Sequence, residues 1–215
     1  MASTSGLPPS VANRPVQARS ELSTLALLDA AAEVIAEVGY ERATLAAIGE
    51  RAGYSHGLVT RRFESKAKLL SALIERMTFV WGDAQLRGRA GDHRGTAGVI
   101  VVIDAVRGFH RRSPREFRAL YSLMFEALKP IPVLRDRMAE LHREFRASIE
   151  LGVREGIEAG LVPASVDPAA VARVLISGLR GAAYQWLLDP GEFDMDRALL
   201  DLRSLMEDML GGRPA

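Results

Sequence analysis

The segment Ala52–Phe63, AGYSHGLVTRRF, decides the expected fold of this 215-residue chain. Gly53 permits the positive φ of a tight turn, and Ser55 is a residue type that caps the start of a helix. A short helix with two adjacent arginines follows and ends on an aromatic residue. Two helices joined by a short turn that contains glycine form a helix-turn-helix, whose second helix enters the major groove of DNA. The segment therefore predicts a recognition helix.

The residues around this segment complete the motif. Thr44 is the expected N-cap of a supporting helix that runs to Ala52. In the second helix, Val59 and Phe63 are four residues apart and are expected to anchor it to the bundle. Long guanidinium groups on the opposite side can pair bidentately with guanine, and backbone N–H groups at helix N-termini bind phosphate. The residues predicted to contact DNA are Thr44, Ser55, His56, Gly57, Leu58, Thr60, Arg61, Arg62 and Lys66.

Charge supports a local rather than a global attraction to nucleic acid. The formal net charge of the chain is only +1. Between Ser55 and Arg89, however, seven basic side chains stand beside three acidic ones. Any DNA affinity must therefore come from this local patch. The alternatives are that the arginines are merely solvated surface charges, or that the basic tip of a helical interaction module binds an acidic protein partner.

Composition excludes several classes of protein. The chain has no cysteine, so it holds no disulfide, no thiolate metal site and no cysteine nucleophile. No apolar run approaches the length of about 20 residues that spans a bilayer, and the N-terminus lacks the pattern of a signal peptide. The four histidines are scattered, without HExxH or G-x-S-x-G spacing. We expect a cytoplasmic protein that is not an enzyme and has no metal, no cofactor and no membrane partner.

Helix signals divide the rest of the chain. Residues 1–20 are rich in Pro, Ser, Ala and Gly, which predicts a mobile basic arm. Apolar spacing predicts a helix from Glu21 to Val38 that Gly39 stops, and Ser113–Glu116 is the sequence of a capping box with Pro at the first helical position. Residues 88–98 have the composition of a loop. The fold class is all-α with about nine helices, the others being expected near 45–51, 56–62, 66–87, 99–111, 114–129, 133–159, 167–188 and 195–210.

The segment Leu27–Arg76 closely resembles the DNA-binding domain of TetR-type transcriptional regulators. The matching features are Gly39-Tyr40, Thr44, Ile48, Ala52-Gly53, Ser55-x-Gly57, Phe63-x-Ser65-Lys66 and Leu69-Leu70. Two departures stand out: the family usually has Ala at Gly49, and it often has Tyr at Thr60 with His or Tyr at Arg62. These departures bear on the preferred DNA sequence rather than on DNA binding itself.

The resemblance implies how the molecule works as a whole. It implies an all-helical homodimer with a helix-turn-helix domain at 21–66 and a C-terminal effector-binding and dimerisation domain at 67–215. The dimer is expected to bind a palindromic double-stranded operator, most often as a repressor. Binding of a small apolar effector would change the distance between the two DNA-binding domains of the dimer and so release the DNA.

Two surfaces of the C-terminal domain are candidates for these roles. An aromatic and methionine cluster, which includes Trp186, predicts an apolar effector cavity, with bundle core as the alternative. The predicted effector contacts are Phe109, His110, Phe117, Tyr121, Met124, Phe125, Phe145 and Tyr184. Arg118 and Glu126 are further candidate polar contacts there. Small and apolar faces of the last two helices predict a dimer interface, with packing inside the subunit as the alternative; its residues are Ser177, Gly178, Gly181, Ala182, Leu199, Leu202, Leu205 and Met206.

Overall fold

The computed structural model describes residues 14–82, 93–128 and 132–211, and within these ranges it contains helices and no strand. This result confirms the all-α prediction. The nine helices of the described residues are α1 (Arg14–Arg42), α2 (Leu45–Ala52), α3 (His56–Phe63), α4 (Lys66–Gly82), α6 (Thr96–Arg112), α7 (Pro114–Glu126), α8 (Pro132–Glu158), α9 (Pro168–Leu188) and α10 (Met195–Met209).

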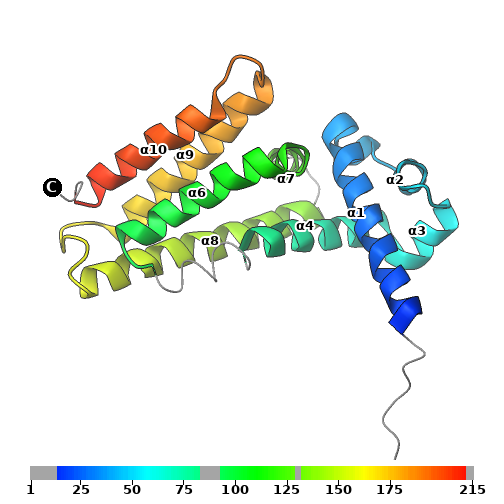
Figure 1. The fold of residues 1–215 in the computed structure, drawn as a ribbon, viewed down its shortest axis with the longest axis horizontal. Coiled ribbons are helices and arrows are strands. Elements are labelled where there is room, and N and C mark those ends of the chain that lie inside the picture. The colour runs from blue at the N-terminus through cyan, green and yellow to red at the C-terminus, as the bar shows by residue number, and fades with distance from the viewer. Residues whose placement is uncertain (1–13, 83–92, 129–131, 212–215) are drawn as a thin grey trace, which may run out of the picture.

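The helices form two groups, and α1 and α4 connect them. Helices α1, α2 and α3 lie together at one end of the molecule, and α4 leads from them into the larger bundle (Figure 1). In that bundle α9 packs on α8 and α10, and α6 packs on α8 and α10 as well. The most extensive contact between the two groups is made by α1 and α7. Movement of α7 therefore acts directly on the helix that carries α2 and α3.

Helix α1 departs from the prediction at both ends. It begins at Arg14, so residues 14–20 of the predicted arm are helical, while residues 1–13 lie outside the described residues. It is broken at Gly39, where φ is 79° and ψ is 162°, and resumes for a final turn. The predicted stop at this glycine is therefore a break within a longer helical segment. Only glycine adopts such a φ without strain.

Capping explains most of the remaining helix boundaries. The carboxylate of Asp167 accepts from the N–H of Ala169 at 2.9 Å, and that of Asp194 accepts from the N–H of Arg197 at 2.9 Å. The predicted capping box at Ser113 is wrong, because the Ser113 side chain makes no capping hydrogen bond although Pro114 opens the helix as expected. The predicted loop is also too long: α6 starts at Thr96, and residues 88–92 lie outside the described residues.

Arg76 of α4 joins the two groups of helices. Its guanidinium donates to the Leu25 carbonyl at 3.0 Å and to Asp29 at 2.6 Å, both on α1. It also lies 3.7 Å from the carboxylate of Glu116 on α7. Glu116 thus pairs across helices instead of reaching back to its own helix N-terminus, which accounts for the missing capping box. The arginine holds α1, α4 and α7 in one arrangement.

Replacement of Asp196 by asparagine is expected to lower the free energy of unfolding by about 1 kcal/mol at pH 7, as for a well-formed ion pair near the surface. Arg107 of α6 donates two hydrogen bonds of 2.6 Å to this carboxylate of α10, and they hold its pKa below its usual range. A lowered folded-state pKa stabilises the native protein above the unfolded value of about 3.9. That stabilisation is lost as the pH falls through the folded value.

Urea denaturation at pH 7 and at pH 3 measures this effect, and the difference between Asp196→Asn and the unchanged protein should shrink at pH 3. Asp201→Asn is the control, because Asp201 pairs at 3.0 Å only with Arg197 of its own helix. Equal losses for the two variants at pH 7 would contradict a role for Asp196 in holding α10 to α6.

Candidate nucleic-acid interface and effector site

The turn between α2 and α3 has the predicted caps and conformation. Thr44 Oγ1 accepts from the N–H of Ala47 at 3.1 Å, and Ser55 Oγ accepts from the N–H of Leu58 at 3.3 Å. Gly53 is left-handed, with φ 74° and ψ 25°. A Cβ added at Gly53 would meet nothing within 4 Å, so backbone rotation and not space favours glycine there. The local predictions for this turn are confirmed.

Gly49 has a different role: it allows the turn and α3 to lie close to α2. A Cβ at this position would lie 2.9 Å from the carbonyl oxygen of Tyr54 and 2.9 Å from Cγ2 of Val59. The N–H of Tyr54 donates to the Gly49 carbonyl at 2.8 Å. The absence of a side chain at Gly49 therefore lets the turn and α3 close tightly onto α2, in a position where the family usually has alanine.

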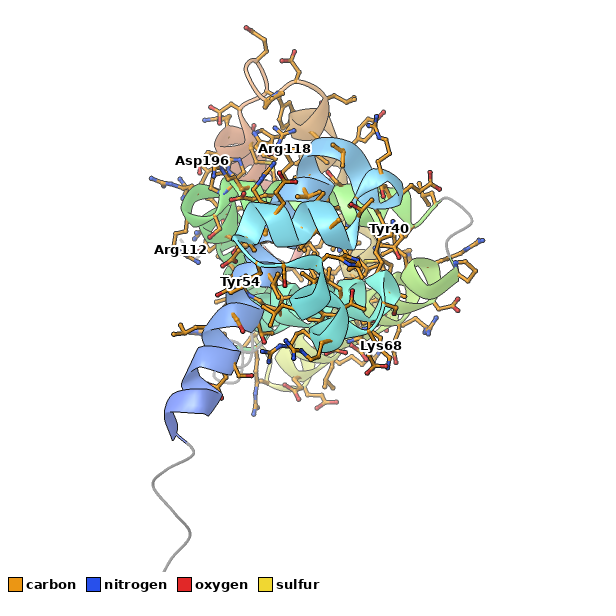
Figure 2. All side chains as sticks on the ribbon, turned by 90° about the vertical axis from the view of Figure 1, so that its right-hand side faces the viewer. Tyr40, Tyr54, Lys68, Arg112, Arg118 and Asp196 are labelled. Carbon is orange, nitrogen blue, oxygen red and sulfur yellow. The ribbon has the colours of Figure 1, made fainter. Side chains whose placement is uncertain are left out.

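Helix α3 is anchored on one side and open on the other. Val59 is fully buried and Phe63 is 6% exposed, as their spacing predicts. The opposite side exposes His56, Gly57, Thr60 and Arg61, with Leu58 and Arg62 half-buried at its edges. Figure 2 views the molecule from the side of α2 and α3, with Tyr54 of the turn labelled on this face. A rigid helix thus presents one arginine directly outward.

The two adjacent arginines are not equivalent. Arg62 donates through Nη1 to Ser20 Oγ, and through Nη2 to Ser23 Oγ at 3.1 Å. Both serines lie on α1, in or next to the segment that was predicted to be a mobile arm. Arg62 therefore fixes the start of α1 against α3, while Arg61 remains exposed. Neutral hydroxyl acceptors leave the charge of Arg62 uncompensated at the edge of the same face.

The side chain of Lys66 is held by backbone carbonyls. Its ammonium donates to the carbonyl oxygens of Tyr40 at 2.8 Å, Glu41 at 3.0 Å and Ala43 at 3.0 Å. It also lies 4.4 Å from the centroid of the Tyr40 ring. An ammonium has three donors, and all three are used here on carbonyls at and just after the end of α1. The side chain of Lys66 therefore positions the end of α1 against α4, and a contact of Lys66 with DNA stays a prediction.

Salt bridges on the neighbouring surface brace the same scaffold. Arg51 of α2 lies 2.7 Å from Glu37 and 3.2 Å from Glu33, both on α1. The hydrogen bond from Arg51 holds the pKa of the Glu37 carboxyl below its usual range. Lys68 pairs with Glu64 at 2.6 Å in the adjacent turn. Helix α2 is thereby tied to α1, so the support for α3 is rigid.

In the C-terminal domain, the predicted aromatic residues separate into two groups. Phe117 is fully buried, and its ring centroid lies 4.4 Å from that of Tyr121, 5.6 Å from Phe109 and 5.1 Å from His110. Trp186, which belongs to the same predicted aromatic cluster, packs edge-on against Phe117 at 5.5 Å. This group fills the bundle core ring against ring.

The second group lies nearer the surface. The rings of Phe125 and Tyr184 meet edge to face at 5.5 Å, and Tyr184 is 50% exposed. Met124 and Phe145 are half-buried against the core. Phe125 follows Tyr121 by one turn of α7, so the second group lies next to the first on that helix.

Several polar atoms are buried near the first group. Among the described residues, the hydroxyl of Tyr121, the Nδ1 atom of His110, and the Nε and Nη1 atoms of Arg180 are buried without a hydrogen-bond partner. Burial raises the pKa of the Tyr121 hydroxyl, and the nearby charge of Arg180 opposes that rise. Sequence reasoning missed Arg180, although it is the lone charge in the run Leu175–Leu188 and that signal was available.

The predicted dimer residues are only partly available for a partner. Leu199, Met206 and Ala182 are buried inside the subunit, and a Cβ at Gly178 would lie 2.5 Å from Leu202 Cδ1. These five residues pack α9 and α10 together, which corrects their assignment to the outer face. Ser177 and Leu205 are exposed and Gly181 is half-exposed. The exposed residues that the prediction missed on α9 are Val174, Tyr184 and Leu188.

A capped helix-turn-helix on a helical bundle defines the class of helical DNA-binding regulators. Residues 27–73 match the model of the bacterial regulatory proteins of the tetR family, and residues 102–211 match that of the BetI-type transcriptional repressor C-terminal domain. The chain belongs to the TetR family of transcriptional regulators. Members are DNA-binding transcription factors and not enzymes, so the family indicates DNA rather than an acidic protein as the class of partner.

Individual relatives agree with this assignment. The chain is 24% identical over 191 residues to the HTH-type transcriptional regulator AcrR of Shigella flexneri, which covers 85% of this chain and 86% of the relative. It has the fold of the SmeT–triclosan complex, SmeT being the repressor of a Stenotrophomonas maltophilia efflux pump (TM-score 0.75, 24% identity, 87% and 90% covered). It also has the fold of Bacillus subtilis FadR in complex with stearoyl-CoA (TM-score 0.72, 19% identity, 88% and 99% covered). Within its described residues, the structure has no helix long and apolar enough to cross a membrane.

The change Gly49→Ala is expected to lower the free energy of unfolding by about 1 kcal/mol, because overpacking outweighs the gain in helix propensity. The added Cβ meets a backbone carbonyl, which cannot move aside as a side chain end can. Urea denaturation followed by circular dichroism measures the change. Gly57→Ala is the matched control, since a Cβ there meets nothing within 4 Å and should not destabilise the protein. A more stable Gly49→Ala variant would contradict the close approach of α2 and α3.

Proposed function

We propose that this protein is a cytoplasmic repressor that binds a palindromic operator as a homodimer and releases it on binding a small, largely apolar effector. The observation that carries the proposal is the exposed, rigidly capped face of α3 with Arg61 pointing outward. Residues 21–66 are the proposed DNA-binding domain and residues 67–215 the effector-binding and dimerisation domain. A second copy of the chain supplies the second half-site contact.

The proposed DNA contacts divide into two kinds. The N-termini of α2 and α3, with Thr44 and Ser55, offer backbone N–H groups to phosphate oxygens, which fix the register of the protein on the duplex. Thr60 and Arg61 face the floor of the major groove, where arginine pairs with guanine. Arg62 adds charge from the side. The other proposed contacts are His56, Gly57 and Leu58.

The proposed dimer surface is the outer face of α9 with its neighbour on α10. Val174, Ser177, Gly181 and Leu188 lie three, four or seven residues apart, so they share one side of α9. Leu205 of α10 is 55% exposed beside them. Two such faces related by a twofold axis bury apolar surface in an isologous four-helix interface. The same twofold axis would place two recognition helices in major grooves about 34–36 Å apart, or at a longer multiple.

The proposed link between effector and DNA is the contact of α7 with α1. Aromatic residues of the candidate effector site lie on α7, and α7 packs on α1 more extensively than any other pair of helices packs. An effector that binds only one position of α7 increases the population of dimers with that position. The distance between the two DNA-binding domains changes accordingly. The ligands named for SmeT and FadR, triclosan and stearoyl-CoA, both have large apolar bodies, which supports an apolar effector here.

Arg61→Ala is expected to reduce operator affinity roughly tenfold to hundredfold, because a bidentate arginine–guanine contact is worth about 1–3 kcal/mol. Arg62→Ala should reduce affinity and also stability, since Arg62 bridges α3 to Ser20 and Ser23. Gel-shift titration at fixed salt, on a duplex selected from random DNA, measures affinity. Arg197→Ala, on exposed α10, is the control and should bind as the unchanged protein does. Unchanged affinity in both Arg61→Ala and Arg62→Ala would refute the assignment of this face.

Leu205→Glu is expected to weaken the dimer by at least about a hundredfold, because an unpaired carboxylate would enter an apolar interface. Sedimentation equilibrium measures the association of the chain. Leu151→Glu is the matched control: Leu151 is 53% exposed on α8, away from the proposed face, and its replacement should leave the dimer intact. A Leu205→Glu protein that remains as dimeric as the control would rule out this surface.

A further inference from the structure

Arg180 of α9 is a cation without a counter-ion. Its Nε and Nη1 atoms are buried and make no hydrogen bond, and no carboxylate of the described residues lies within salt-bridge distance of it. Its guanidinium lies 5.1 Å from the centroid of the Tyr121 ring, which is its one aromatic compensation among the described residues. Arg180 as a whole is half-buried, and burial of two of its N–H-bearing nitrogens without hydrogen-bond partners is costly to the native state. The described side chains thus leave the arrangement incomplete.

Tyr121 of α7 presents a second unmet donor at the same place. The residue is fully buried, and its hydroxyl makes no hydrogen bond within the described part of the chain. Burial raises the pKa of this hydroxyl, so it stays protonated at neutral pH and can donate. A guanidinium has only donors, whereas the Tyr121 hydroxyl can also accept from Arg180. That hydroxyl is neutral, so within the described residues no negatively charged acceptor stands beside the two groups.

The surroundings of these donors are positive and apolar. On α8, burial and the charges of Arg180 and Arg146 lower the pKa of His142. His142 is therefore neutral at pH 7 and is no counter-ion for Arg180. Phe117 stacks on Tyr121 at 4.4 Å. Tyr184, one helical turn after Arg180 on α9, is half exposed and meets Phe125. Aromatic rings therefore extend from the surface of α9 to the two donors.

We infer that the effector of this protein carries a carboxylate on an apolar body, and that Arg180 and Tyr121 bind the carboxylate oxygens. The inference rests on the proposed function, in that it assumes an effector in the C-terminal domain, and it names the chemistry of that effector. Arginine receives a carboxylate through two parallel hydrogen bonds, and the tyrosine hydroxyl donates a third to the same group. The rings of Phe125 and Tyr184 contact the apolar body.

Stability separates a binding role from a structural one. If Arg180 serves a ligand, replacement by methionine removes an unpaired charge at similar volume, so the melting temperature should stay the same or rise. If Arg180 instead holds α9 on Tyr121 by its cation–π contact, the same change should lower the melting temperature. Arg173→Met is the matched control, because Arg173 is an exposed arginine of the same helix that pairs with Asp167 at 3.4 Å.

Ligand binding is tested on the purified full-length chain without DNA. The probes are 4-phenylbutyrate and decanoate, each compared with its uncharged amide of equal length. Trp186 stands edge-on to Phe117 and His110 in the same cluster, so tryptophan fluorescence and the shift in melting temperature both report binding. The unchanged protein is expected to bind at least one of the acids at least about tenfold more tightly than its amide.

The variants then locate the acid group. Arg180→Met should abolish the preference for the acid over the amide, Arg180→Lys should retain part of it, and Tyr121→Phe should weaken acid binding severalfold. The Arg173→Met control should keep the full preference. The inference is overturned if neither acid binds at 1 mM, if acid and amide bind equally to the unchanged protein, or if Arg180→Met prefers the acid as the unchanged protein does. Arg180→Lys and Tyr121→Phe keep the test decisive should Arg180→Met fail to fold.

These outcomes are distinct from those of the proposed function. Loss of acid preference in Arg180→Met is measured without DNA, so this result does not depend on whether the chain binds an operator. Conversely, a chain that discriminates acids from amides but binds no selected duplex would remove the operator proposal and leave the carboxylate site standing.

Discussion

The whole arrangement depends on how the end of α1 is held between two other helices. The break at Gly39 turns the N–H of Tyr40 toward α7, where Glu126 Oε2 accepts it at 2.8 Å. A Cβ at Gly39 would lie 2.5 Å from the other oxygen of Glu126, so the site needs glycine for both φ and space. From the opposite side, Lys66 of α4 binds three carbonyls of the same segment. A carboxylate from α7 and an ammonium from α4 thus fix one short stretch of backbone.

This arrangement explains how a distant event can reach α3 without deforming it. Helices α2 and α3 are stiff, with a cap at each N-terminus, the close approach at Gly49, and the bond of Arg62 to α1. Rigid units transmit displacement at their junctions, because packed interiors do not deform continuously. In the proposed mechanism, a shift of α7 would be passed through Glu126 and Arg76 to α1, and α3 would move with α1 as one body.

The sequence predicted well what depends on local rules. Gly53 and Ser55 specify a turn and a cap through backbone preferences alone, and Val59 and Phe63 specify a buried side through spacing, so the recognition helix could be derived from a dozen residues. What failed depends on partners far away in the chain. The glutamate of the capping box at Ser113 pairs with an arginine of α4. The contacts of the Lys66 ammonium with carbonyls at the end of α1 were likewise not foreseen.

The same limit explains the two surfaces of the C-terminal domain. Periodicity shows which residues of α9 and α10 share a side, yet it cannot tell whether that side meets a helix of the same subunit or of a partner; Gly178 meets Leu202, while Leu188 meets solvent. A chain built for stability alone would not bury the Tyr121 hydroxyl and two nitrogens of Arg180 without hydrogen-bond partners, since each unmet donor costs free energy. Sites that break local rules of stability are where function is expected, and here the missing group is a negatively charged hydrogen-bond acceptor.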